Sequence, residues 1–331
     1  MKTKTASNIL DYIRKNGKAR PYDLVRFLDI SQVALHKQLL GLIEKGLLVK
    51  QGTSPRVYYE LPEQTKKVSS LPYPVVENAL EQRLIDLDYL SVSPTGVLRE
   101  GYRGFVEWVR DIGEEKRLDA LTDEYIHVRK EADRHIVEGR IDATEKIQKT
   151  FDSCFLDRLF YRDFYSLPKF GKTKLGSLML YAKQSQQRAL ITRIVAETKK
   201  TIETLILEFK IQAIAYIPPT VPRAIQFLKE YRYGLSLPLP EVHLRKIQGD
   251  IIVPQKTLTR LEERIINARS TIIIDNTIFH FKNVLLIDDA VGSGATLNET
   301  ARKLKEEGVA KKVIGFAVVG SYKGFDVVRE A

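Results

Sequence analysis

The stretch NVLLIDDAVGSGATLNETA, residues 283–301, constrains the fold of this chain more than any other. Four apolar residues at 284–287 run into Asp288 and Asp289, and a loop of small residues follows. A helical pattern then runs from about residue 296 to 307. Strand, glycine-containing loop and helix form the repeating unit of parallel α/β sheets, which bind ligands at the carboxyl ends of their strands. The stretch therefore predicts a parallel-sheet α/β domain with a ligand site at this loop.

The side chains of this loop suggest which ligand it takes. Gly292 and Gly294 let backbone N–H groups crowd around an anion, and the start of the next helix adds its dipole. Ser293 and Thr296 offer hydroxyl donors, and the two aspartates before the loop are acceptors. Acceptors beside a phosphate site suit a phosphorylated ribose. The loop lacks the GK[ST] of a Walker loop and the GxGxxG of a dinucleotide site. An ordinary strand–turn–helix that is rich in glycine is the alternative.

VLLIDDAVGSGAT resembles the signature of type I phosphoribosyltransferases, which bind 5-phosphoribosyl pyrophosphate (PRPP). The resemblance implies that Asp288 and Asp289, the catalytic pair, hold the ribose 2′- and 3′-hydroxyls. It implies that Mg²⁺ arrives with the pyrophosphate and is bound mostly by the ligand, so that no direct protein metal site is needed. The 5′-phosphate would be held by the residues of the loop, which are Ala290, Val291, Gly292, Ser293, Gly294, Ala295 and Thr296.

Further segments carry the same resemblance over about residues 155–320. The sequence PPTVPR, 218–223, follows a short apolar strand pattern and is similar to the family's pyrophosphate loop, with Pro219, Thr220 and Arg223 as its contacts. The segment between the two loops, together with YAKQS, resembles the ComF-like branch. The further ligand contacts that this resemblance implies are Lys183, Arg245, Lys246, Gln255, Arg264 and Asn267. Taken singly, the arginines could instead be surface charges and Asn267 a helix cap.

Residues 1–62 show three helical patterns followed by a hairpin pattern. In the third, apolar residues recur on one face of the helix, and Ser31 is a good N-cap. Gly46 ends this helix. The helices are predicted at 7–16, from Pro21, and at 31–45, and the strands at 47–51 and 56–61.

The sequence DLVRFLDISQVALHKQLLGLIEKGLL resembles a winged helix-turn-helix. Residues 1–62 carry eleven Lys or Arg against five Asp or Glu, a net +6 of the chain's +11, which favours a polyanion partner. The resemblance implies that the helix at 31–45 enters the major groove of DNA and that the wing meets phosphates. The implied DNA contacts are Ser31, Gln32, His36, Lys37, Lys50 and Arg56. The alternatives are a protein-interaction or dimerisation module and, for His36 alone, a solvated helix residue.

We divide the chain into a winged helix at 1–62, a helical connector at 63–145 and a phosphoribosyltransferase-like domain at 146–331. The connector contains a segment of mixed charge, 114–140, which is typical of a solvated helix face or of a dimer contact, so a homodimer is expected. Its two histidines, His127 and His135, are too far apart for an i, i+4 metal pair.

No apolar run approaches the length of a membrane span, and the basic N-terminus is not followed by the apolar segment of a secretory signal. Cys154 is the only cysteine, which excludes an internal disulfide and the cysteine zinc ribbon that often opens ComF-like chains. A cytoplasmic protein without a membrane partner is expected.

Two functions remain open, and a third is weaker. The first is a DNA-binding regulator that senses PRPP or a nucleotide, and the second is an active phosphoribosyltransferase with an accessory winged helix. Gly292 stands where the 6-oxopurine enzymes of the family carry an aspartate, which disfavours a purine-salvage enzyme of that type. The third is a nucleic-acid-processing factor that binds without sequence preference.

Overall fold

The computed structural model describes residues 2–52, 56–61, 79–247, 249, 251, 253–254, 257–275 and 279–323. The chain divides into two compact units, Met1–Val75 and Val76–Ala331. Each unit has its own hydrophobic core, so each is treated by itself.

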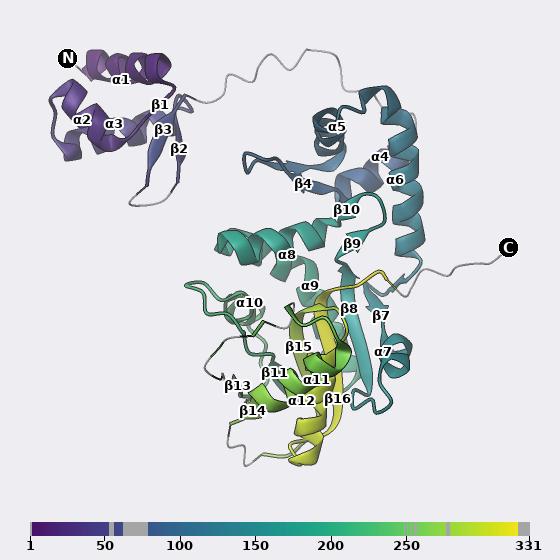
Figure 1. The fold of residues 1–331 in the computed structure, drawn as a ribbon. Helices are drawn as coiled ribbons and strands as arrows, with labels where there is room; N and C mark the ends of the chain where they lie inside the picture. Colours follow the sequence, from purple (N-terminus) through teal and green to yellow (C-terminus); the bar gives the residue numbers. More distant parts are fainter. Residues whose placement is uncertain are drawn as a thin grey trace. The chain divides into compact units, whose positions relative to one another are not determined.

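The N-terminal unit consists of three helices and a small antiparallel sheet (Figure 1). Ile9, Leu24 and Leu39, one from each helix, are buried in its core. The three helices and the hairpin agree with the sequence patterns, while the short strand β1, which pairs with β3 at the edge of the sheet, is an addition. In chain order the elements are α1 (Lys2–Asn16), β1 (Lys18–Ala19), α2 (Pro21–Leu28), α3 (Gln32–Glu44), β2 (Val49–Gln51) and β3 (Tyr58–Glu60).

The larger unit is built on a seven-stranded sheet in the order β12-β11-β15-β16-β8-β7-β6. The first five strands in this order are parallel, and β7 and β6 continue the sheet in antiparallel fashion. This confirms the prediction of a parallel sheet for the first five strands, while the antiparallel β7 and β6 are an addition. The strands are β6 (Ile136–Val137), β7 (Arg140–Asp142), β8 (Arg158–Phe164), β11 (Ala213–Tyr216), β12 (Glu241–Val242), β15 (Phe281–Val291) and β16 (Ala310–Gly320).

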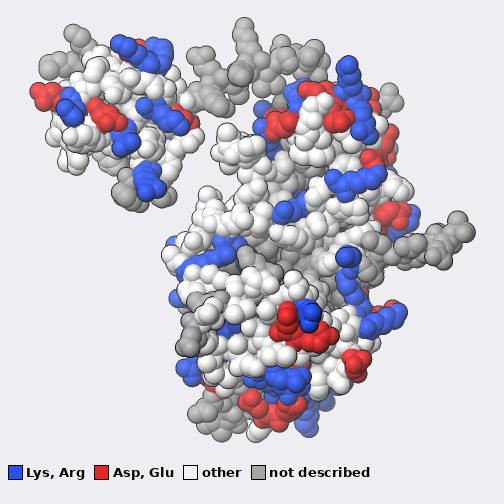
Figure 2. Space-filling view, viewed as in Figure 1, with Lys and Arg blue, Asp and Glu red and all other residues white. Residues whose placement is uncertain are grey.

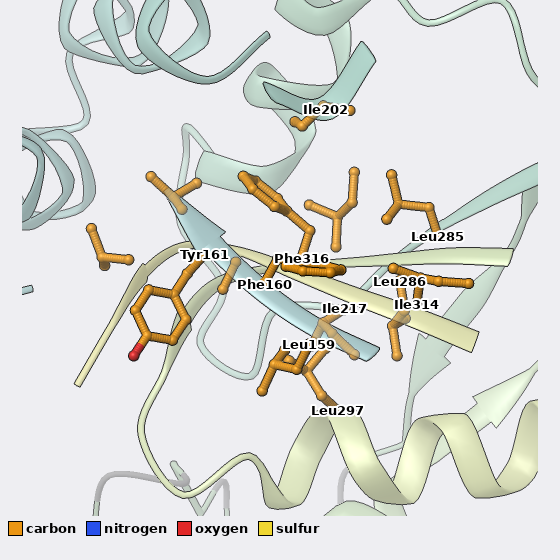
Figure 3. Packing of buried hydrophobic residues seen from close by; sticks show 14 of the residues in the cluster. Leu159, Phe160, Tyr161, Ile202, Ile217, Leu285, Leu286, Leu297, Ile314 and Phe316 are labelled. Carbon is orange, nitrogen blue, oxygen red and sulfur yellow. The ribbon is translucent and has the colours of Figure 1, made fainter. Parts of the chain in front are cut away.

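Helices cover both faces of this sheet, which explains why its central strands are apolar along their length. Residues 284–287 of β15 are fully buried. Figure 3 shows Ile202 of α9 on one side of the strands and Leu297 of α12 on the other. The helices of the larger unit are α4 (Ala79–Asp88), α5 (Gly101–Asp111), α6 (Leu118–Asp133), α7 (Thr144–Thr150), α8 (Lys174–Ser185), α9 (Arg188–Glu208), α10 (Phe227–Leu235), α11 (Leu261–Thr271) and α12 (Ala295–Glu306). None of the described helices has the length and apolar character needed to cross a membrane.

Three two-stranded antiparallel sheets complete the larger unit: β4 (Leu90–Val92) with β5 (Leu98–Glu100), β9 (Ser166–Leu167) with β10 (Gly171–Lys172), and β13 (Leu244–Lys246) with β14 (Ile272–Ile274). Between α5, α6 and the β9–β10 hairpin lies a cluster of rings, in which Phe105 packs against Tyr125 and Phe170. The cluster joins the connector segment to the sheet domain within one unit.

The mixed-charge helix α6 differs from the solvated face that its sequence suggested. It buries apolar residues such as Leu121 and Ile126, and it also buries the charged Arg129, which is 1% exposed. The prediction of a solvated charged face is wrong at Arg129, because Asp133 and Asp163 neutralise it inside the protein.

Candidate functional site

The acid pair lies near the carboxyl end of β15. This is the side of the sheet on which the parallel strands end, and it is called the carboxyl edge below. β15 continues through Val291, so Asp288 and Asp289 are the last acidic residues within the strand and do not follow it. The first two residues assigned to the phosphate loop, Ala290 and Val291, also pair with β16 as strand residues. The sequence predicted that the strand ends before the aspartates, which is too early. Hydrogen bonding to β16 keeps the polar residues after Ile287 extended, like the apolar residues before them.

Two lysines from distant parts of the chain converge on the acid pair. Nζ of Lys183, near the end of α8, lies 2.6 Å from Oδ2 of Asp289. Nζ of Lys246, on β13, donates to Oγ1 of Thr220 over 2.7 Å and acts electrostatically on Asp288. The structure thus brings together the acids, both lysines and the pyrophosphate-loop threonine that the sequence had suggested separately.

The electrostatics of this edge are shaped by burial. Desolvation raises the pKa of Asp288 to about 7, with the neighbouring charge of Asp289 adding to the shift and both lysines opposing it. Burial lowers the pKa of Lys246, and the carboxylate of Asp288 opposes that shift. Two carboxylates beside two lysines form a polar cluster that could accept hydrogen bonds from hydroxyl groups and hold an anion.

The loop after β15 and the start of α12 contain the groups that the sequence predicted to bind a phosphate. Gly294, the N-cap of α12, has φ +82°, a backbone conformation that favours glycine, and it provides no side-chain cap. A Cβ at Gly294 would lie 2.6 Å from Cδ1 of Ile147, whereas one at Gly292 would meet nothing within 4 Å. Ser293 Oγ accepts a long hydrogen bond of 3.4 Å from the N–H of Ala295. The N–H groups of the first helical turn have no intrahelical acceptors and can bind an anion.

The loop after β11 is tied to the end of α8. The Arg223 guanidinium donates to the backbone carbonyl of Lys183, and the N–H of Ile225 donates to Oε1 of Gln186 over 2.9 Å. Pro219 of this loop is exposed. Arg223 therefore positions the loop, and in this structure it does not point freely into solvent as a charged donor. No sequence pattern singled out Gln186, because its role depends on a contact between two segments.

The remaining predicted ligand contacts are less closely grouped. Arg245 is exposed and pairs with Asp275. On α11, which packs against α12, Nε of Arg264 donates to the carbonyl of Leu258, and the carbonyl of Asn267 accepts from Thr271. Gln255 lies outside the described residues.

In the N-terminal unit, the predicted DNA contacts lie on the surface. Ser31 Oγ accepts from the N–H of Ala34 over 3.2 Å, which confirms Ser31 as the N-cap of α3. Gln32, His36 and Lys37 are exposed on α3, and Lys50 and Arg56 are exposed on the hairpin. On the face of this unit shown in Figure 2, basic side chains are spread widely, with fewer acidic ones between them.

Among the described residues, no group of three or more His, Cys, Asp or Glu is arranged to hold a metal ion. The acid pair offers only two carboxylates, and a lysine already lies against one of them. A divalent ion would therefore need oxygen ligands from water or from a bound molecule to complete its shell.

Comparison with known proteins supports a type I phosphoribosyltransferase domain. Residues 193–324 match the family model described as "Phosphoribosyl transferase domain". The matched range contains β11, β15 and β16, the loops after β11 and β15, and the acid pair. No curated protein matches the chain.

Proposed function

We propose that the chain is a DNA-binding regulator whose phosphoribosyltransferase-like domain, of the ComF-like branch, binds PRPP or a nucleotide and couples that binding to DNA affinity. The observation that supports ligand binding is the acid pair near the carboxyl end of β15, between Lys183 and Lys246 and beside the N-terminus of α12. The family match makes PRPP or nucleotide binding the function expected of such an edge.

Each part of PRPP has a counterpart at this edge. Asp288 and Asp289 would accept from the ribose hydroxyls, and residues 292–296 would bind the 5′-phosphate with backbone N–H groups and hydroxyls. Lys183 and Lys246 would face the pyrophosphate. A Mg²⁺ ion would be held mainly by the pyrophosphate oxygens.

The DNA half rests on the N-terminal unit. Its helices and hairpin follow the order of a winged helix, and α3 presents Gln32, His36 and Lys37 to solvent. The net charge of +6 over residues 1–62 suits the phosphate backbone. We propose that α3 binds in the major groove and that Lys50 and Arg56 contact phosphates. We also propose a cytoplasmic homodimer, since paired half-sites match two copies of such a unit.

An active phosphoribosyltransferase is the second candidate, and the convergence of cations favours it. Lys183 and Lys246 lie where they could stabilise the negative charge that builds up on a departing pyrophosphate. Binding and orientation of PRPP beside a base would supply the rest of the rate enhancement. The same edge therefore serves a sensor and an enzyme equally well in its binding step.

The first experiment is calorimetric titration of the full chain with PRPP and MgCl₂, with released pyrophosphate assayed across a panel of bases. Binding without pyrophosphate release supports the sensor, and release with one base makes the protein an enzyme. No binding would overturn the ligand half of the proposal.

The DNA half is tested separately, by selection of bound sequences from random DNA with and without PRPP. A selected motif whose affinity changes with PRPP supports the regulator. Lys37→Ala should weaken binding to that motif and make its salt dependence shallower if Lys37 contacts a phosphate. Binding without sequence preference would favour a nucleic-acid-processing role, and no DNA binding would favour a dimerisation module.

A further inference from the structure

A polar cavity of about 230 Å³ lies in the larger unit, away from the acid pair. It opens beside residues 162–163 of β8, past the last β8 residue that pairs with β7. Its walls come from α6, α8, α9, the end of α4 and the β6–β7 hairpin. The cavity is smaller than the roughly 300 Å³ at which sites for drug-sized ligands begin, so it suits a smaller molecule.

Most of the charged groups that line this cavity already have partners. Arg129 donates to both carboxylate oxygens of Asp163 and also pairs with Asp133. Nζ of Lys174 lies 2.8 Å from a carboxylate oxygen of Glu197. These pairs neutralise one another and hold the walls of the cavity in place.

Two lining residues of opposite charge, Asp88 and Arg162, form no ion pair among the described residues. Within the described residues, the carboxylate of Asp88 forms no hydrogen bond or ion pair, although it lies in the field of Arg129, Lys174 and two further carboxylates. Burial raises its pKa to about 6, which shows that the protein does not compensate its charge fully. Arg162 donates through Nε to the backbone carbonyl of Glu197 over 3.1 Å, and this is the contact of its guanidinium among the described residues.

The remaining wall of the cavity is apolar. Ile136, Leu175 and Leu178 line it, and α8 supplies the two leucines. A ligand that fits these walls carries a positive group, a negative group and a short apolar part. An uncompensated carboxylate binds an ammonium group, and the terminal nitrogens of a guanidinium bind a carboxylate in bidentate fashion.

We propose that this cavity binds a small zwitterion of the amino-acid class with an aliphatic side chain, its ammonium group on Asp88 and its carboxylate on Arg162. The site is separate from the acid pair and does not depend on PRPP binding. Helix α8 connects the two places, since residues near its start line the cavity and Lys183 near its end pairs with Asp289.

The test is calorimetric titration of the full chain with L-valine, L-leucine and L-methionine, at about pH 8 so that Asp88 is ionised. Two matched probes then divide leucine into its halves: 3-methylbutylamine has the ammonium but no carboxylate, and 4-methylpentanoate has the carboxylate but no ammonium. We expect at least one amino acid to bind and both half-ligands to bind at least about tenfold more weakly, because each loses a charged hydrogen bond.

Variants locate the binding. Asp88→Asn and Arg162→Gln should each weaken amino-acid binding by about tenfold or more. Glu203→Gln, at an exposed position on α9 outside the cavity, should leave it unchanged. Circular dichroism confirms that each variant is folded. The proposal is overturned if none of the three amino acids binds at millimolar concentration, or if binding survives both cavity variants. PRPP titrations of the same variants keep its outcome distinct from that of the proposed function.

Discussion

Helices α3 and α12 are of similar length, yet they differ in which part could bind another molecule. The N-terminus of α3 is closed by the hydroxyl of Ser31, and its apolar stripe is buried while the opposite face, with Val33 81% exposed, meets solvent. Most residues of α12 are buried, and its N-terminus begins at Gly294 without a side-chain cap. One helix can therefore act through its face and the other through its end.

The difference follows from what surrounds each helix. α12 packs against the sheet on one side and against α11 on the other, where Arg269 and Arg302 both pair with the buried Glu299. The backbone N–H groups at its start have no side-chain cap from Gly294, which suits a small anion. α3 lies on a small unit with a core on one side only, which suits a large and flat partner.

Loss of the acid pair should give the largest effect, a fall in PRPP affinity at the site beside the N-terminus of α12. It should not change DNA binding through the exposed face of α3. Asp288→Asn with Asp289→Asn should lower PRPP affinity on the order of 100-fold or more, because each carboxylate hydrogen bond contributes about 1.5–3 kcal/mol. Calorimetric titration measures it, with the exposed Asp123→Asn as the control. DNA binding without ligand should persist. Unchanged PRPP affinity would show that the ribose does not bind there.

A side chain at the N-cap of α12 should destabilise the larger unit next most strongly. Gly294→Ala places a Cβ against Ile147 at a positive φ, and we expect a loss of about 2 kcal/mol in the free energy of unfolding. Gly292→Ala is the matched control, since its Cβ meets nothing within 4 Å. Denaturant unfolding of both variants measures the difference. Equal stability of the two would mean that the backbone at 294 tolerates a side chain.

Removing the charge of Asp288 should change how stability depends on pH. The pKa of Asp288 in the folded protein, raised to about 7, lies above its value in the unfolded chain. Its protonated form therefore contributes to the free energy of unfolding at low pH, and this contribution is lost as pH rises through 7 and the carboxyl group ionises. Asp288→Asn should therefore raise the melting temperature over wild type by a few degrees at about pH 8, and by little at about pH 4. Calorimetry across this range tests it. A gain that is the same at every pH, or that Asp123→Asn reproduces, would contradict the shift.

Removing the cap of α3 should have the smallest effect, confined to the N-terminal unit. Ser31→Ala should cost about 1 kcal/mol, because the N–H of Ala34 loses its acceptor, and Ser31→Asp should restore the cap. Hydrogen exchange of the α3 amides in the full chain measures the local change. If Ser31→Asp exchanges as fast as Ser31→Ala, the hydroxyl is not acting as a cap.

Local patterns predicted several of the elements but placed one important boundary too early. The helices of the N-terminal unit and the strand containing 284–287 follow from apolar spacing. The end of β15 did not, because Asp288 and Asp289 do not look like strand residues. The ladder between β15 and β16 keeps them extended. Pairing between two strands cannot be predicted from the sequence of either strand alone.

By itself, the sequence determined the class of the larger unit and the identity of its acid pair, since an apolar strand, two aspartates and a small-residue loop occupy consecutive positions. Only the tertiary structure decided which cations meet those acids, that Arg129 is buried, and that Asp88 and Arg162 line one cavity. The reason is physical. Side-chain periodicity reports which face of an element is buried, whereas an ion pair between Lys183 and Asp289 depends on how helices and strands pack across the whole sheet.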